Sequence, residues 1–111
     1  MKILLLGSGG REHAFAWKLA QSKRLTTLYI APGNAGTQGL GVNVALNPND
    51  IPAVISFVED HQIDLILVGP EEPLVRGIVD AFAQHPNVNH LPVIGPDSIG
   101  AQLEGSKDFS K

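Results

Sequence analysis

The sequence predicts a doubly wound α/β domain, in which a mostly parallel sheet carries helices on both faces. Three observations lead to this prediction. Short apolar runs end at glycine or at polar residues, other segments repeat apolar residues at helical spacing, and the two kinds alternate along the chain. Such alternation requires crossover connections, which place the helices on both sides of a parallel sheet. The length of 111 residues fits a single domain.

Five strands are expected. The first and the fourth are uninterrupted apolar runs, which is typical of strands that are buried on both faces. The others are short and lie next to glycine, proline or asparagine, which interrupt strands. The expected strands cover residues 2–6, 27–31, 42–46, 64–69 and 92–95.

Helices are expected between these strands. The first covers residues 11–21. The second begins after Asp50, which caps it, and tolerates Pro52 in its first turn. The third opens at Pro73, and a short fourth helix starts at residues 96–98. The apolar face of the third helix is expected to consist of Leu74, Val75, Ile78, Val79 and Phe82.

Composition excludes several classes of function. The absence of cysteine excludes thiol catalysis, disulfides and cysteine-based zinc sites, and we expect neither a catalytic residue nor a metal site in this chain. The net charge is −3 and no basic cluster is interleaved with aromatic residues, which argues against nucleic acid as a partner. The longest apolar run, residues 3–6, is far shorter than the ~20 residues of a membrane span. A cytoplasmic domain without membrane contact is therefore expected.

Charge is unevenly distributed along the chain. Residues 1–24 carry a net charge of +4, and residues 25–111 carry −7. Either the first helix is simply basic on an acidic body, or it faces a small anion.

A glycine-rich turn, residues 7–10, joins the first strand to the first helix. Glycine allows a ligand to approach the N–H groups at a helix N-terminus, where the helix dipole favours anions. A dinucleotide is disfavoured, because Glu12 stands where the third glycine of that motif would be. No acidic residue lies between Glu12 and Asp50 to hold the ribose of NAD. Glu12 could instead hydrogen-bond a sugar or an amine, or could simply be a first-turn acid that suits the helix dipole.

Two more loops follow strand ends and are expected at the same crevice. Residues 31–37 contain glycines and Asn34, and form either a nest of N–H groups for a phosphate or a plain turn. Residues 68–74 hold Glu71 and Glu72 between two prolines. One of these carboxylates is expected to cap the following helix as its anionic N-terminal residue, which leaves the other free for a ligand.

Five segments of the chain together resemble the glycinamide ribonucleotide synthetases (phosphoribosylamine–glycine ligases) of purine biosynthesis. These segments occur in the order and spacing of that family and span the whole chain. They are GGREHA at 9–14, APGNAGT at 31–37, VGPEEPL at 68–74, IGP at 94–96 and QLEGSK at 102–107.

The resemblance implies a Rossmann-like N-terminal domain, residues 1–105, that precedes an ATP-grasp region, with residues 106–111 starting the connection. It implies that ATP, glycine and 5-phosphoribosylamine give glycinamide ribonucleotide, ADP and phosphate through a glycyl phosphate. ATP and Mg²⁺ would belong to the full-length enzyme, together with its ATP-grasp and C-terminal domains. This fragment would bind no cofactor tightly and would be inactive alone.

The resemblance also assigns residues. The phosphoribosyl substrate would meet Gly9, Gly10, Arg11, Glu12 and Glu71, and the expected nest of N–H groups adds Asn34 to this set. Lys107 matches a lysine placed near the phosphates of ATP. An alternative is a free-standing module that binds a sugar phosphate or a nucleotide. A phospho-acceptor receiver domain would need acidic residues just after the first strand, where this chain has glycine and serine.

Overall fold

The protein is a five-stranded, wholly parallel sheet between two layers of helices, as a computed structural model shows for residues 1–21, 23 and 25–95. The side chains of residues 10–12 lie outside this description. The strands are β1 (Lys2–Gly7), β2 (Thr27–Pro32), β3 (Val42–Asn43), β4 (Leu65–Val68) and β5 (Val93–Ile94). The helices are α1 (Gly10–Ala20), α2 (Ile51–His61), α3 (Glu72–Val75) and α4 (Ile78–Gln84).

The sheet has the strand order β3-β2-β1-β4-β5, so β1 lies at its centre. Leu5 of β1 pairs with Ile30 of β2 on one side and with Leu67 of β4 on the other. From β1 the chain first builds outward to β2 and β3, and then crosses back to β4 and β5. This reversal creates a switch point between β1 and β4, which is where doubly wound sheets open a crevice for ligands.

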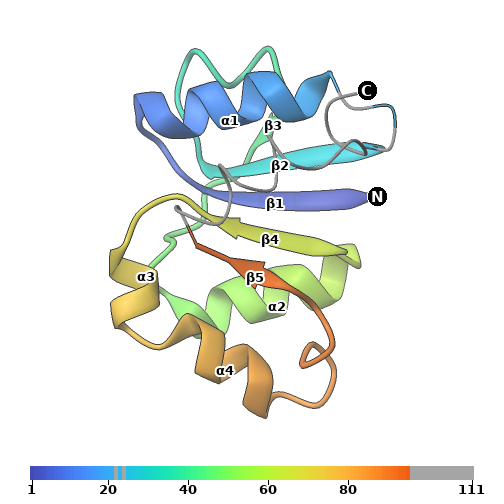
Figure 1. The fold of residues 1–111 in the computed structure, drawn as a ribbon, viewed down its shortest axis with the longest axis vertical. Helices are drawn as coiled ribbons and strands as arrows, with labels where there is room; N and C mark the ends of the chain where they lie inside the picture. Colours follow the sequence, from blue (N-terminus) through green and yellow to red (C-terminus); the bar gives the residue numbers. More distant parts are fainter. Residues whose placement is uncertain (22, 24, 96–111) are drawn as a thin grey trace.

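Both faces of β1 are buried, because its residues alternate between two apolar clusters. Ile3 and Leu5 pack in the cluster that includes Ala16 and Leu19 of α1. The intervening leucines of β1 pack against α2 and α4 on the opposite face. In Figure 1, α1 lies above the sheet, while α2 and α4 lie below it. The prediction of a doubly wound α/β domain is therefore confirmed.

Local sequence signals fix the ends of α2. The Asp50 side chain accepts a hydrogen bond from the Ala53 N–H at 3.4 Å, so the expected cap is present. Pro52 lies in the first turn of the helix, where a backbone N–H would have no partner within the helix, so proline removes no hydrogen bond there. The helix ends at His61, and the next residue, Gln62, has a left-handed φ of 54° that turns the chain toward β4.

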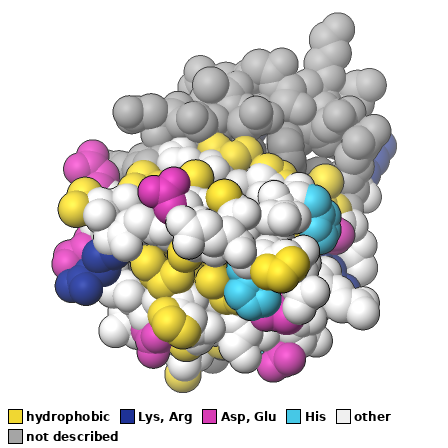
Figure 2. Space-filling model, turned by 90° about the horizontal axis from the view of Figure 1, so that it is seen from below, with side chains coloured by type: hydrophobic (Ala, Val, Ile, Leu, Met, Phe, Trp, Pro, Cys, Tyr) yellow, Lys and Arg dark blue, Asp and Glu magenta, His cyan; other side chains and the backbone are white. Residues whose placement is uncertain are grey.

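The expected single helix from Pro73 to Phe82 is wrong, because the chain forms two short helices, α3 and α4. Gly77 lies between them with φ of 90°, a conformation that interrupts the helix. The break turns part of the predicted apolar face outward, so Val75 is 84% exposed and Val79 is 46% exposed. Ile78 and Phe82 remain buried under the sheet. Figure 2, seen from the side of α4, shows exposed hydrophobic side chains on this face.

Two further predictions differ from the structure or fall outside it. The third strand ends at Asn43 and not at Leu46, because only Val42 and Asn43 pair with β2. The expected helix at residues 96–98 and the connection at 106–111 lie outside the described residues. Among the helices that the structure describes, none is long and apolar enough to cross a membrane.

Candidate functional site

Three loops come together at the carboxyl edge of the sheet. They are residues 8–9 after β1, residues 33–37 after β2 and residues 69–71 after β4. Two backbone hydrogen bonds join the flanking loops to β1. The Gly33 N–H donates to the Gly7 carbonyl at 3.0 Å, and the Gly69 N–H donates to the Leu6 carbonyl at 3.0 Å. The glycine turn therefore lies between the other two loops at the switch point of the sheet.

The glycine turn leads directly into α1. Gly7 has φ of 137°, which an L-residue rarely adopts, and Gly9 is the extended residue that precedes the first turn of the helix. The N-cap residue Gly9 has no side chain with which to cap this end of α1. Within the described part of the chain, the N–H groups of Ser8 and Gly9 donate to no other residue. Such N–H groups beside a helix N-terminus favour an anionic ligand.

The loop after β2 is fastened to the glycine turn by Asn34. The Asn34 Nδ2 donates to the Ser8 carbonyl at 2.6 Å, and its Oδ1 accepts from the Thr37 N–H at 3.0 Å. The Thr37 Oγ1 in turn accepts from the Asn34 N–H at 2.8 Å and donates to Asn43 Oδ1 at 2.8 Å. The Asn43 Nδ2 donates to the Asn34 carbonyl at 2.8 Å. We call Asn34, Thr37 and Asn43 the loop network.

Two glycines make room for this arrangement. Gly33 has φ of 74°, and a Cβ there would lie 2.6 Å from Asn43 Cγ and 2.9 Å from Thr37 Oγ1. A Cβ on Gly36 would lie 3.3 Å from Nε2 of His13, so the imidazole of α1 lies against this loop. The N–H groups of Ala35 and Gly36 donate to no other residue among those that the structure describes.

The two carboxylates after β4 have different surroundings. Glu72 stands in the first turn of α3 and forms an ion pair with Arg76 at 3.0 Å. Glu71 precedes the helix, and its side chain neither caps the helix nor bonds to any other described residue. The expected capping carboxylate is therefore absent: the N-cap residue Glu71 makes no side-chain bond to the helix, and Glu72 stands in the first turn, where an acid suits the helix dipole.

The remaining predicted site residues are placed only in part. Gly10, Arg11 and Glu12 form the first turn of α1, and their backbone therefore lies at the same edge as Asn34 and Glu71. Lys107 lies outside the described residues.

Thr37 and Asn43 were not among the residues predicted from the sequence. An Asn-x-x-Thr spacing in a turn is a signal for side-chain bonds to the backbone, and it could have pointed to Thr37. Nothing in the sequence indicates that Asn43 folds back onto the loop.

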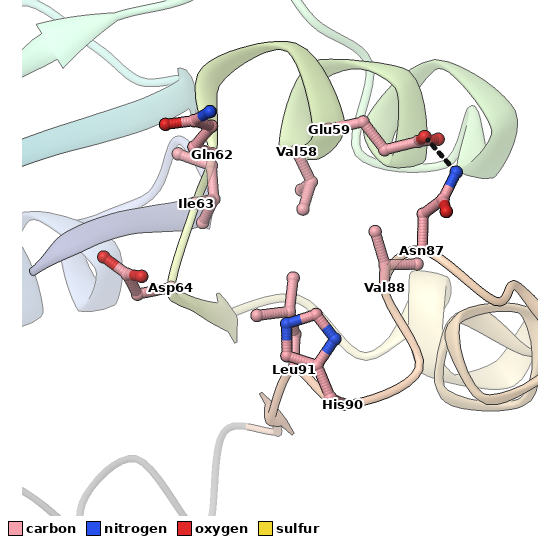
Figure 3. A pocket seen from close by; sticks show the side chains of 9 residues that line it. All are labelled: Val58, Glu59, Gln62, Ile63, Asp64, Asn87, Val88, His90 and Leu91. Carbon is pink, nitrogen blue, oxygen red and sulfur yellow. Dashed lines mark hydrogen bonds between the residues drawn. The ribbon is translucent and has the colours of Figure 1, made fainter.

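A hollow of about 260 Å³ lies at the opposite edge of the sheet (Figure 3). Its apolar lining includes Val58, Ile63 and Val88, which are at most 3% exposed and belong to the core. Its polar residues, Glu59 and Asn87 among them, come from the end of α2, the connection between α2 and β4, and the loop before β5. Glu59 and Asn87 bond to each other at 3.0 Å. Gly9, Asn34 and Glu71, the predicted site residues whose side chains or backbone the structure fully describes, do not line this hollow.

The described residues do not assemble a metal centre. Nowhere in residues 1–21, 23 and 25–95 do three or more histidine, aspartate or glutamate side chains gather as metal ligands would. The edge formed by the three loops offers glycine N–H groups, one free carboxylate and the end of α1. This set suits a small ligand that carries both an anionic group and hydroxyl or amino groups.

Comparison with known proteins agrees with the fold and with the sequence motifs. Residues 1–104 match the family described as phosphoribosylglycinamide synthetase, N domain. Over its whole length the chain is 52% identical to a phosphoribosylamine–glycine ligase of Vibrio cholerae and 51% identical to that of Escherichia coli. A solved phosphoribosylamine–glycine ligase of Thermotoga maritima superimposes with a TM-score of 0.51 and 30% identity, over 65% of this chain and 16% of that one. The chain spans about a quarter of the length of the two curated relatives.

Proposed function

The chain belongs to the phosphoribosylglycinamide synthetase N-domain family, and from this membership we propose that it is the N-terminal domain of a phosphoribosylamine–glycine ligase of purine biosynthesis. The observation that carries the proposal is about 50% identity to such ligases along the entire chain. The three loops at the carboxyl edge of the sheet support it, because they present the groups that a phosphorylated amino sugar requires.

The proposed reaction joins glycine to 5-phosphoribosylamine with ATP. The glycine carboxylate attacks the terminal phosphate of ATP, which forms glycyl phosphate and releases ADP. The amine of phosphoribosylamine then attacks the acyl carbon, and phosphate leaves. The products are glycinamide ribonucleotide, ADP and phosphate. We assign the binding of phosphoribosylamine to this domain.

The proposed contacts follow from the chemistry of each loop. The glycine turn, with Gly9 and Gly10, donates backbone N–H groups to the phosphate, and the guanidinium of Arg11 adds positive charge. Glu12 and Glu71 accept hydrogen bonds from ribose hydroxyls or from the amine. Asn34 is assigned to the site because its side chain bonds to the Ser8 carbonyl and so holds the loop after β2 against the glycine turn.

ATP and Mg²⁺ are assigned to the remainder of the full-length enzyme, with Lys107 at the approach to that region. The described residues gather no carboxylate cluster that fits Mg²⁺. The domain alone is proposed to be inactive, and ligation to need the ATP-grasp and C-terminal domains.

The proposal is tested on the full-length protein that carries this chain, by following glycinamide ribonucleotide formation with phosphoribosylamine, glycine and ATP. Glu71→Gln is expected to raise KM for phosphoribosylamine by roughly tenfold, the equivalent of one charge-assisted hydrogen bond. Glu72→Gln is the matched control, because the Glu72 carboxylate is engaged by Arg76 at the surface, and KM should stay within about twofold. A wild-type protein that forms no glycinamide ribonucleotide would refute the proposal and favour a free-standing sugar-phosphate or nucleotide module.

A further inference from the structure

Thr37 is the one polar side chain among the described residues that is completely buried, with 0% exposure. A buried hydroxyl without partners destabilises a protein, so its hydrogen bonds account for its position. The Thr37 Oγ1 accepts from the Asn34 N–H and donates to Asn43 Oδ1, both at 2.8 Å. The hydroxyl therefore joins the start of the loop after β2 to the edge strand β3.

Both ends of the Asn34 amide take part in the loop network. Its Nδ2 is committed to the Ser8 carbonyl at 2.6 Å and its Oδ1 to the Thr37 N–H at 3.0 Å. Each atom makes one of its two possible hydrogen bonds in this network, so a ligand could bond to the second N–H of Nδ2 without loosening the loop. The Asn34 side chain is thus suited to hold the two loops together.

The network leaves different groups of the same loop available. Among the described residues, the N–H groups of Ala35 and Gly36 have no partner, and both lie between Asn34 and Thr37. Bonds from Asn34 to Thr37 close the loop around these two residues. The same bonds therefore fix where the free N–H groups lie relative to Ser8 and Gly9 in the glycine turn.

We propose that Thr37 and Asn43 are positioning residues for phosphoribosylamine, which act by holding the Ala35–Gly36 segment against the glycine turn through Asn34. This inference rests on the proposed function of the domain. Neither Thr37 nor Asn43 touches the substrate. They fix in advance the N–H groups that bind it, so that no binding energy is lost in ordering the loop.

The test uses the full-length ligase with three variants. Thr37→Val keeps the shape of the buried side chain and removes the hydroxyl, whereas Thr37→Ser keeps the hydroxyl. Asn43→Ala removes the partner in β3, on the far side of the loop network from Ser8. Steady-state KM is measured for each of the three substrates, and amide hydrogen exchange is measured for residues 33–37.

Thr37→Val and Asn43→Ala each remove two hydrogen bonds of the loop network. Both variants are expected to raise KM for phosphoribosylamine by roughly tenfold and to leave KM for ATP within about twofold. Both variants should also speed exchange in residues 33–37, and Thr37→Ser should restore both properties. An unchanged KM for phosphoribosylamine, an equal rise for all three substrates, or a serine variant that behaves like valine would overturn the inference.

The two proposals fail in different ways. If wild-type enzyme makes no glycinamide ribonucleotide, the proposed function is wrong, and the exchange rates in residues 33–37 still decide whether Thr37 orders the loop. If wild-type enzyme is active and exchange is faster in Thr37→Val with KM unchanged, the function stands and the positioning role is wrong.

Discussion

Replacing Gly33 with alanine should destabilise the domain more than replacing Gly39 or Gly77. At φ of 74°, an L-residue costs about 1–2 kcal/mol relative to glycine. The new Cβ would also lie 2.6 Å from Asn43 Cγ, so the Asn43 side chain must move away. That movement breaks its bonds to the Asn34 carbonyl and to Thr37 Oγ1, each worth about 0.5–1.5 kcal/mol. The expected loss is therefore about 3 kcal/mol.

Two other glycines separate the contributions to this loss. Gly77 has φ of 90° and no neighbouring atom within 4 Å of where an alanine Cβ would lie, so Gly77→Ala measures backbone strain alone, about 1–2 kcal/mol. Gly39 has an ordinary φ and equally open space, so Gly39→Ala should change stability by less than about 1 kcal/mol. The assay is urea unfolding of the 111-residue chain, followed by far-ultraviolet circular dichroism. If Gly33→Ala and Gly77→Ala lost the same free energy of unfolding, the steric part of this reasoning would be wrong.

Three further outcomes are expected. Phe82→Ala should lower the free energy of unfolding by about 3–5 kcal/mol, because Phe82 is only 1% exposed. Val75→Ala should change it by less than about 0.5 kcal/mol, because Val75 faces solvent beside the break in the helix. If urea unfolding gave similar values for the two variants, the break at Gly77 would be contradicted. Asp50→Ala should cost about 1 kcal/mol in the same assay through loss of the α2 cap, and Asp50→Asn should recover most of it. Glu12→Gln in the full-length enzyme should lower kcat/KM for phosphoribosylamine by the equivalent of on the order of 1.5–3 kcal/mol. An equal loss in kcat/KM for ATP and glycine would indicate a folding defect instead.

The sheet could be predicted because burial on both faces leaves a plain pattern in the sequence. The runs at residues 3–6 and 65–68 are wholly apolar, and the glycines that follow them mark where each strand ends. The break at Gly77 could not be predicted in this way. Apolar spacing continues across Gly77 from Val75 to Ile78, and periodicity does not report that a single residue has adopted a left-handed conformation.

The candidate site could be predicted at the level of loops and not at the level of bonds. Parallel strands bring their carboxyl ends to one edge, so topology alone places Gly9, Asn34 and Glu71 at the same edge of the sheet. The choice of which acid after β4 is free depends on Arg76, one helical turn beyond Glu72, and that pairing is recognisable from the spacing. The bond from Thr37 to Asn43 depends on how the loop folds back, which no local pattern encodes.

The anchoring of two loops on β1 bears on how this domain could be re-engineered. The carbonyl groups of Leu6 and Gly7 hold Gly69 and Gly33, so the register of the central strand sets the starting point of both neighbouring loops. The residues after Gly69 could therefore be replaced by those of a homologue without moving the loops that follow β1 and β2. Inserting one residue into β1 would have the opposite effect. It would displace both anchors together and exchange the side chains that face α1 with those that face α2.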